Sequence, residues 1–182
     1  MRLWKLTDAK DQTRGGCQWG ENVTVLTSGF GPLCGSGFTH WYTDPLLAVF
    51  LNQIHGRFDL DTAHLWEGEG EVAKTDGGLK VGCTKATTIR RVELPHVTRE
   101  QTINFGILVA LEVYRETTFV TWAQAWLRGS DRTCSSAYAA GYAAYAVADA
   151  VAYAAYAAYA AATAEDAGRS LDLIALAHRA IE

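Results

Sequence analysis

The sequence predicts an α+β fold, in which a small mixed or antiparallel β domain at residues 1–95 precedes an all-α region at residues 96–182. Two observations support this prediction. Up to Pro95 the chain is rich in glycine, threonine and short apolar runs, which are typical of strands and turns. Beyond Pro95 there is no further proline, and apolar residues recur at helical spacing. We therefore expect a β-rich domain followed by helices, one of them long and rich in alanine and tyrosine.

Short runs of β-branched and aromatic residues, bounded by turn-forming residues, predict the strands of the first domain. One helix interrupts them, because Asp44 is a good N-cap and Pro45 fits the first helical position, which predicts a helix over 44–54. A glycine-rich connection at 31–37 comes before this helix, and an Asp-Gly-Gly turn at 76–78 comes after it. The predicted strands are residues 2–7, 22–27, 38–42, 64–73, 79–83 and 87–94.

The helical region begins with Thr98 and Gln101, which have the spacing of a capping box. The apolar stripe that follows predicts a first helix after this box. A second helix is predicted over 117–128, where Trp122 and Trp126 lie one turn apart. The last segment predicts another packed helix from its residues at helical spacing, which are Leu171, Leu173, Ile174, Ala175, Leu176 and His178.

The stretch 137–162 contains 16 alanines in 26 residues, and alanine is the best helix former. At about 100° per residue, its six tyrosines fall within a sector of roughly 120° on the predicted helix. Asp149 occupies the centre of this sector, and alanine with two valines forms the opposite face. The predicted tyrosine face consists of Tyr138, Tyr142, Tyr145, Asp149, Tyr153, Tyr156 and Tyr159.

Three uses of this helix can be compared. A membrane span is disfavoured, because a carboxylate and six phenols would lie in hydrocarbon. Helix–helix packing is favoured, because small side chains let helix axes approach and tyrosine suits contacts that are apolar on the flank and wet at the tip. We expect a homo-oligomer built on the tyrosine face. The alternative is a stacking platform for purine bases, with Asp149 as a hydrogen-bond acceptor.

Composition limits the classes of partner. The formal net charge is −4 and the isoelectric point is about 5.7, which argues against a dedicated nucleic-acid-binding protein. The N-terminus has no apolar run of signal-peptide length, so we expect a cytoplasmic protein with free thiols, in the host cytoplasm if the protein is viral. The four cysteines form no CxxC pair and the five histidines no HxH or HxxxH pair, so no metal and no cofactor are expected.

Two groups of residues in the first domain could carry chemistry. Strand alternation places His40 and Tyr42 on one face with Trp41 opposite, either as a surface that contacts a base or ribose or as a partly buried aromatic cluster. Alternation likewise places Glu67, Glu69 and Glu71 on one face, either for acid–base chemistry or as a solvated strand face.

The order of four segments resembles ADP-ribosyltransferase-like folds. GSGFTHWYTDPLLAVFL (35–51) resembles the strand and helix that flank the NAD pocket in that family. RLWKLTD (2–8) is similar to its first strand, LWEGEGEV (65–72) to a core strand, and LKVGCTKATTIRRVEL (79–94) to its closing strand pair. The arrangement also resembles small phage and prophage proteins with an alanine-rich tail. The resemblance covers residues 1–95 and implies an ADP-ribosyltransferase-like β-rich domain there.

The departures from this family are as informative as the matches. Lys5 stands where the family's first strand has a histidine, and the position of the catalytic glutamate falls near Lys80. Tyr42 matches the family's central tyrosine, with Thr39 and His40 as alternatives. The resemblance thus implies the pocket without the carboxylate that would stabilise positive charge as nicotinamide leaves. It implies a ligand-binding set of Lys5, Thr7, His40, Trp41, Tyr42 and Lys80.

Three functions follow from these observations. The first is a non-catalytic homo-oligomer that binds or sequesters a nucleotide-derived, ADP-ribose-like ligand, as a viral anti-defence protein would. The second is a purely structural homo-oligomer built on the alanine–tyrosine helix. The third is an active ADP-ribosyltransferase that uses Glu67, Glu69 or Glu71 in an atypical site. The first is preferred, because lysines occupy the positions of the catalytic histidine and glutamate.

Overall fold

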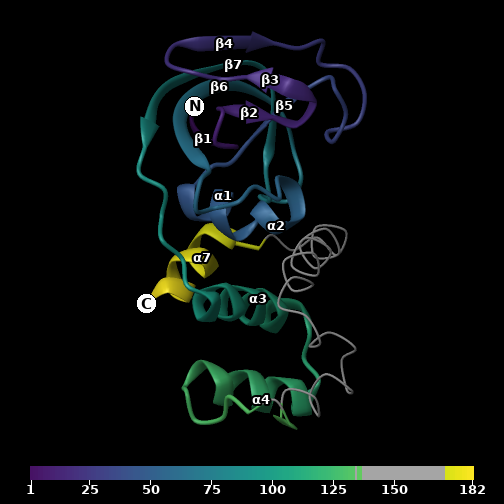
Figure 1. The fold of residues 1–182 in the computed structure, drawn as a ribbon. Coiled ribbons are helices and arrows are strands. Elements are labelled where there is room, and N and C mark those ends of the chain that lie inside the picture. Colours follow the sequence, from purple (N-terminus) through teal and green to yellow (C-terminus); the bar gives the residue numbers. More distant parts are fainter. Residues whose placement is uncertain (134, 137–170) are drawn as a thin grey trace. The chain divides into compact units, whose positions relative to one another are not determined.

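The computed structural model describes residues 1–133, 135–136 and 171–182 (Figure 1). Its fold is α+β with antiparallel strand pairing, as predicted. The chain divides into two compact units, Met1–His96 and Val97–Glu182. All described strands belong to the first unit, and helices make up the second.

The sheet of the first unit curls into a ring of strands. Its longest members, β6 (His64–Thr75) and β7 (Val81–Val92), pair with each other along most of their length. The other strands add to these two: β1 (Arg2–Thr7) to β6, and both β4 (Val23–Leu26) and β5 (Thr39–Trp41) to β7. Reciprocal backbone hydrogen bonds of 2.9 Å between Trp4 and Tyr42 connect β1 to the end of β5, so β1, β6, β7 and β5 form a closed circuit.

The packing of side chains inside this ring explains the repeated Glu-Gly pattern of β6. A Cβ atom at Gly68 would lie 2.7 Å from the Trp41 indole, and one at Gly70 would lie 2.9 Å from Cys83 Sγ. Only glycine leaves room there, while the alternate glutamates face outward. The apolar core inside the ring consists of Leu3, Trp19, Trp41, Val81, Cys83 and Ala86.

The helix predicted over 44–54 is present as two short segments, α1 (Pro45–Phe50) and α2 (Asn52–His55). The predicted start is confirmed, because the Asp44 side chain accepts a hydrogen bond of 2.8 Å from the Leu46 amide and Pro45 is the first helical residue. Leu46 to Leu51 are all buried, so α1 anchors this segment in the apolar core and positions α2 at its end.

Two details of the strand prediction were wrong or incomplete. The segments 79–83 and 87–94 were predicted as separate strands, but β7 is continuous, because its polar centre pairs with β4 on one side and β6 on the other. A small hairpin was not predicted, in which β2 (Gln12–Thr13) and β3 (Cys17–Gln18) are joined by the 3₁₀ turn η1 (Arg14–Gly16). Strands of two residues are too short to show a periodic pattern.

The second unit contains α3 (Arg99–Val113), α4 (Thr117–Leu127) and α7 (Leu173–Ile181). The predicted capping box is confirmed, since Thr98 and Gln101 exchange side-chain-to-backbone hydrogen bonds. The core between α3 and α4 consists of Ile107, Phe119, Trp122 and Ala123. α7 packs beside α3, and the Gln101 side chain donates a hydrogen bond to the Ile181 carbonyl.

The predicted alanine–tyrosine helix at 137–162 lies outside the described residues, together with its proposed interface of Tyr138, Tyr142, Tyr145, Asp149, Tyr153, Tyr156 and Tyr159. That helix and its role in oligomerisation remain predictions. In the part of the chain that the structure describes, no helix has the length and apolar character needed to cross a membrane.

Candidate functional site

Four polar side chains form a continuous hydrogen-bonded chain in the first unit, which we call the His55 network. Tyr42 Oη lies 3.1 Å from His55 Nδ1, and His55 Nε2 lies 3.1 Å from Lys80 Nζ. Lys80 Nζ in turn donates to Asp76 Oδ2 at 2.8 Å. The network therefore joins a phenol, an imidazole, an ammonium and a carboxylate, in that order, through successive hydrogen bonds.

The four members of the network come from three parts of the first unit. Tyr42 follows β5, and His55 is the last residue of α2. Asp76 and Lys80 flank the turn between β6 and β7, where Gly77 and Gly78 have φ values of 63° and 90° that suit glycine. Asp76 Oδ1 also accepts from the Lys80 amide at 2.7 Å, which fixes the turn and the direction of both side chains.

Burial and the Lys80 ammonium determine the protonation of the network. Burial, the charge of Lys80 and the proximity of His40 lower the pKa of His55 to about 4, so its imidazole is neutral near pH 7. Burial and the Asp76 carboxylate raise the pKa of Tyr42 above its ordinary value. The network at neutral pH consists of a neutral phenol, a neutral imidazole and one ion pair.

His40 lies near this network and contacts Lys5 through its backbone carbonyl. Its Nε2 atom contacts the Leu33 carbonyl, and its own carbonyl accepts a hydrogen bond of 2.7 Å from Lys5 Nζ. Burial lowers the pKa of His40, with smaller effects in the same direction from Lys5 and Lys80. His40 is only half-buried and thus offers a surface next to the network.

Lys5 lies inside the ring and has no carboxylate partner among the residues that the structure describes. Its Nζ atom is 4.7 Å from the ring centroid of Trp19 and 5.4 Å from that of Trp41. The residue is 6% exposed, and burial lowers the pKa of its ammonium to about 8. Cation–π contacts and one backbone carbonyl are the interactions that hold this charge.

The structure thus divides the predicted ligand-binding residues between two faces. Tyr42 and Lys80 join the His55 network, whereas Lys5, Thr7 and Trp41 lie inside the ring. Trp41 and Thr7 are 0% exposed, so the predicted stacking of Trp41 on a ligand base does not fit this placement. The cause is strand alternation, which turns Trp41 inward between its two polar neighbours and makes it the centre of the core.

Two members of the network, His55 and Asp76, were not predicted. Signals for both exist in the sequence. His55 directly follows the helix predicted over 44–54. Asp76 begins the Asp-Gly-Gly turn, and Lys80 comes four residues after it. Their proximity depends on the pairing of β5 with β7, which no local pattern shows.

A second polar cluster surrounds Asp11, which has a left-handed φ of 59°. Its Oδ1 atom accepts from His64 Nδ1 at 2.8 Å and from Trp66 Nε1 at 2.9 Å. Its Oδ2 atom accepts from Arg91 at 2.7 Å. One carboxylate thus ties the loop before β2 to both long strands, and all of its oxygens are occupied by these structural contacts.

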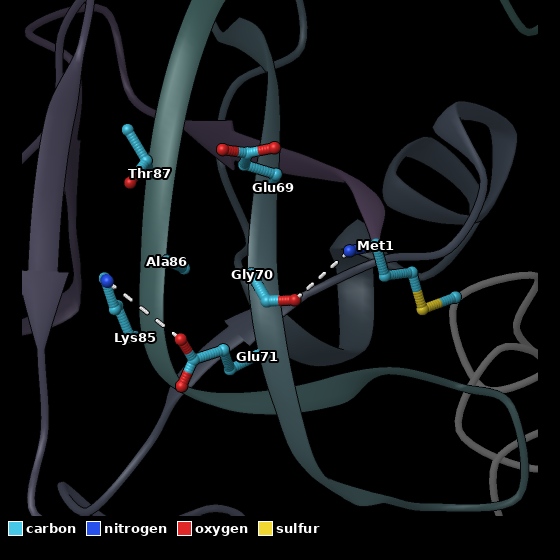
Figure 2. A pocket seen from close by; sticks show the side chains of 7 residues that line it. All are labelled: Met1, Glu69, Gly70, Glu71, Lys85, Ala86 and Thr87. Atoms are coloured by element: carbon cyan, nitrogen blue, oxygen red, sulfur yellow. Dashed lines mark hydrogen bonds and ion pairs between the residues drawn. The ribbon is translucent and has the colours of Figure 1, made fainter.

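The three glutamates of β6 lie apart from the His55 network. Glu67 is paired with Arg2 and Arg90. Glu69 and Glu71 line a shallow, open groove whose other lining residues are Met1, Gly70, Lys85, Ala86 and Thr87 (Figure 2). Glu71 reaches Lys85 at 4.0 Å across this groove. Glu69 and Glu71 are exposed, which fits the alternative interpretation of a solvated strand face, whereas the Glu67 side chain is only 12% exposed between its two arginines.

Within residues 1–133, 135–136 and 171–182, no three His, Cys, Asp or Glu side chains converge in a way that could hold a metal ion. Cys17, Cys34 and Cys83 are free thiols. The resemblance to ADP-ribosyltransferase-like folds stays a prediction, since no family model, no curated protein and no solved structure matches this chain.

Proposed function

We propose that the first unit binds an anionic, nucleotide-derived small molecule of the ADP-ribose type beside His40, His55 and Lys80, and does not transform it. The observation that supports this proposal is the Lys80 ammonium at the partly exposed edge of the His55 network. Among the described residues Asp76 is its single carboxylate partner, so a ligand phosphate can share its charge through a charge-assisted hydrogen bond.

The accessible edge of the site is formed by His40, His55 and Asp76, which are all partly exposed. A ligand phosphate at this edge would share the Lys80 ammonium with Asp76, and His40 and Tyr42 would lie next to the attached sugar or base. A binding role suits the neutral His55 and the protonated Tyr42, because both orient hydrogen bonds without exchanging protons near pH 7.

An active transferase is less well supported by the geometry. Such an enzyme needs a carboxylate at the reacting ribose. Glu67 is held by two arginines, and Glu69 and Glu71 line the separate groove of Figure 2. Asp76 is the carboxylate of the His55 network, and it is paired with Lys80. We therefore favour sequestration of the ligand over its chemical conversion.

Calorimetric titration of the full chain with ADP-ribose and NAD at low salt tests the proposal. We expect saturable binding that Lys80→Met weakens by about tenfold or more, because a charge-assisted contact is worth about 1.5–3 kcal/mol. The matched control is Lys10→Met, which removes a lysine that is exposed and distant in sequence from the network. Absence of binding to both nucleotides, or equal binding by the Lys80 and Lys10 variants, would contradict the proposal.

A further inference from the structure

We infer that the His55 network recognises a ligand through two hydrogen-bond donors, the Tyr42 hydroxyl and the third N–H of Lys80, and so selects two linked oxyanions such as a diphosphate. This inference rests on the proposed function and specifies which ligand group the site takes.

Lys80 fixes the tautomer of His55. An ammonium can only donate, so His55 Nε2, at 3.1 Å from Lys80 Nζ, has to accept. The imidazole is neutral in its partly buried position beside a cation, so it carries a single proton. That proton must therefore be on Nδ1, and the Nδ1–H group donates to Tyr42 Oη at 3.1 Å.

The Tyr42 hydroxyl is consequently an acceptor toward His55, and its own hydrogen is left for another group. Among the described residues, His55 is the single hydrogen-bond partner of Tyr42 Oη. Tyr42 is only 7% exposed, and a buried O–H without an acceptor costs free energy unless a ligand or water supplies one. Lys80 is in a similar state, since Asp76 and His55 take two of its three N–H groups.

These two donors define the chemistry of the ligand. Both need an acceptor, so an oxyanion fits, whereas an ammonium or an amide N–H would face another donor. The imidazole separates Tyr42 Oη from Lys80 Nζ, so one small anion reaches only one of the donors. A ligand with two linked oxyanions reaches both, which is the reason for favouring a diphosphate over a single phosphate.

The experiment uses the full chain, with inorganic pyrophosphate and inorganic phosphate as probes. The ¹⁵N–¹H spectrum of the histidine side chains should show His55 protonated on Nδ1 near pH 7. Calorimetry should show tighter binding of pyrophosphate than of phosphate, by about tenfold for one extra charge-assisted hydrogen bond. Tyr42→Phe should weaken pyrophosphate binding by about tenfold and so remove most of this preference. Tyr114→Phe, in the second unit, is the matched control and should change neither affinity.

The outcomes separate the inference from the proposed function. If the wild-type protein binds neither anion nor ADP-ribose, the proposed function is overturned and the inference falls with it. If it binds both anions but Tyr42→Phe keeps the pyrophosphate preference, only the inference is overturned. A His55 protonated on Nε2 would overturn it as well, even if Tyr42→Phe failed to fold, because this measurement needs no variant.

Discussion

His55 makes the stability of the first unit sensitive to acid. Its folded-state pKa of about 4 lies below the ordinary value of 6.5, so the unfolded chain takes up a proton first as the pH falls. The stability that the neutral imidazole contributes is complete above about pH 6.5 and is lost progressively toward pH 4. The depressed pKa of His40 acts in the same direction.

We predict that the free energy of unfolding falls by about 2 kcal/mol between about pH 7 and pH 5, and that His55→Gln removes most of this dependence. Urea denaturation of both proteins at the two pH values measures it. His96→Gln is the control, since His96 is exposed in the segment between β7 and α3. An identical pH dependence in the wild type and the His55 variant would contradict the placement of His55 beside Lys80.

Lys5 changes stability with pH in the same direction as His55, but over a more alkaline range. Its folded-state pKa of about 8 lies below the ordinary value of 10.5, so the native state loses its proton first as the pH rises. At neutral pH Lys5 is protonated in both the native and the unfolded state, and burial of its ammonium lowers the stability of the native state. That cost declines as the pH rises from about 8 to 10.5.

Lys5→Met should therefore raise the free energy of unfolding by about 1–3 kcal/mol at pH 7, because methionine fills a similar volume without a buried charge. The gain should shrink near pH 10. Thermal denaturation at both pH values measures it, with Lys10→Met as the exposed counterpart. A Lys5→Met variant that is less stable at pH 7 would show that the contacts of Lys5 with Trp19, Trp41 and His40 outweigh its desolvation.

At the residue scale, the sequence indicated Lys5, His40, Tyr42 and Lys80 as candidate site residues, but not which of them contact one another. Tyr42 and Lys80 belong to one network, but the imidazole that joins them is 13 residues from Tyr42 and 25 from Lys80. Nothing local indicates that these segments meet. Trp41 was predicted to bind the ligand, but it is buried in the core. An aromatic residue in a short strand can pack in a core or contact a ligand, and only the complete fold shows which of the two it does.

At the scale of elements, β6 shows how closely a strand can be fitted to its core. The inward glycines exist because Trp41 and Cys83 occupy the space where their side chains would be. We predict that Gly68→Ala lowers the free energy of unfolding by about 2–4 kcal/mol, since the new methyl group would overlap the Trp41 ring and the Thr87 carbonyl.

Chemical denaturation of Gly68→Ala and Gly20→Ala tests this fit. Gly20 is the matched control, because a Cβ atom there would meet only Val23 Cγ2 at an ordinary 3.4 Å, and the change should be within about 0.5 kcal/mol. Equal stability of the two variants would mean that Trp41 does not fill the ring next to Gly68.

The elements that the sequence predicted best are those with local end signals. The Asp44–Pro45 start of α1 and the Thr98–Gln101 capping box were both confirmed, because a cap is a contact between residues two or three positions apart. The break expected within β7 was wrong, since Lys85 and Ala86 are kept extended by their partners in β4 and β6. Local patterns predict helix starts well, but long-range pairing determines where a strand ends.

At the scale of the whole molecule, the two units have separate cores and separate secondary structure. The predicted homo-oligomer depends on the tyrosine face of residues 138–159, which lies outside the described residues. We predict that Tyr145→Glu combined with Tyr156→Glu dissociates the oligomer, because two carboxylates would have to be desolvated in the interface.

Light scattering of the purified protein measures its mass. The double variant Tyr145→Phe and Tyr156→Phe is the control, since it keeps the aromatic surface and should keep the wild-type mass. A wild-type monomer, or an unchanged mass in the glutamate variant, would contradict an interface on this face.

The ring of the first unit also determines when this protein can fold during synthesis. Apart from the β2–β3 hairpin and the bridge between Trp4 and Tyr42, every early strand pairs with β6 or β7, which come last in the unit. A ribosome that adds about 5–20 residues per second therefore exposes β1, β4 and β5 for several seconds without partners. Trp41 and the apolar residues of α1 are solvated throughout that interval. The first unit is thus expected to depend on chaperones until β7 has left the ribosome, and to acquire its core in one late step.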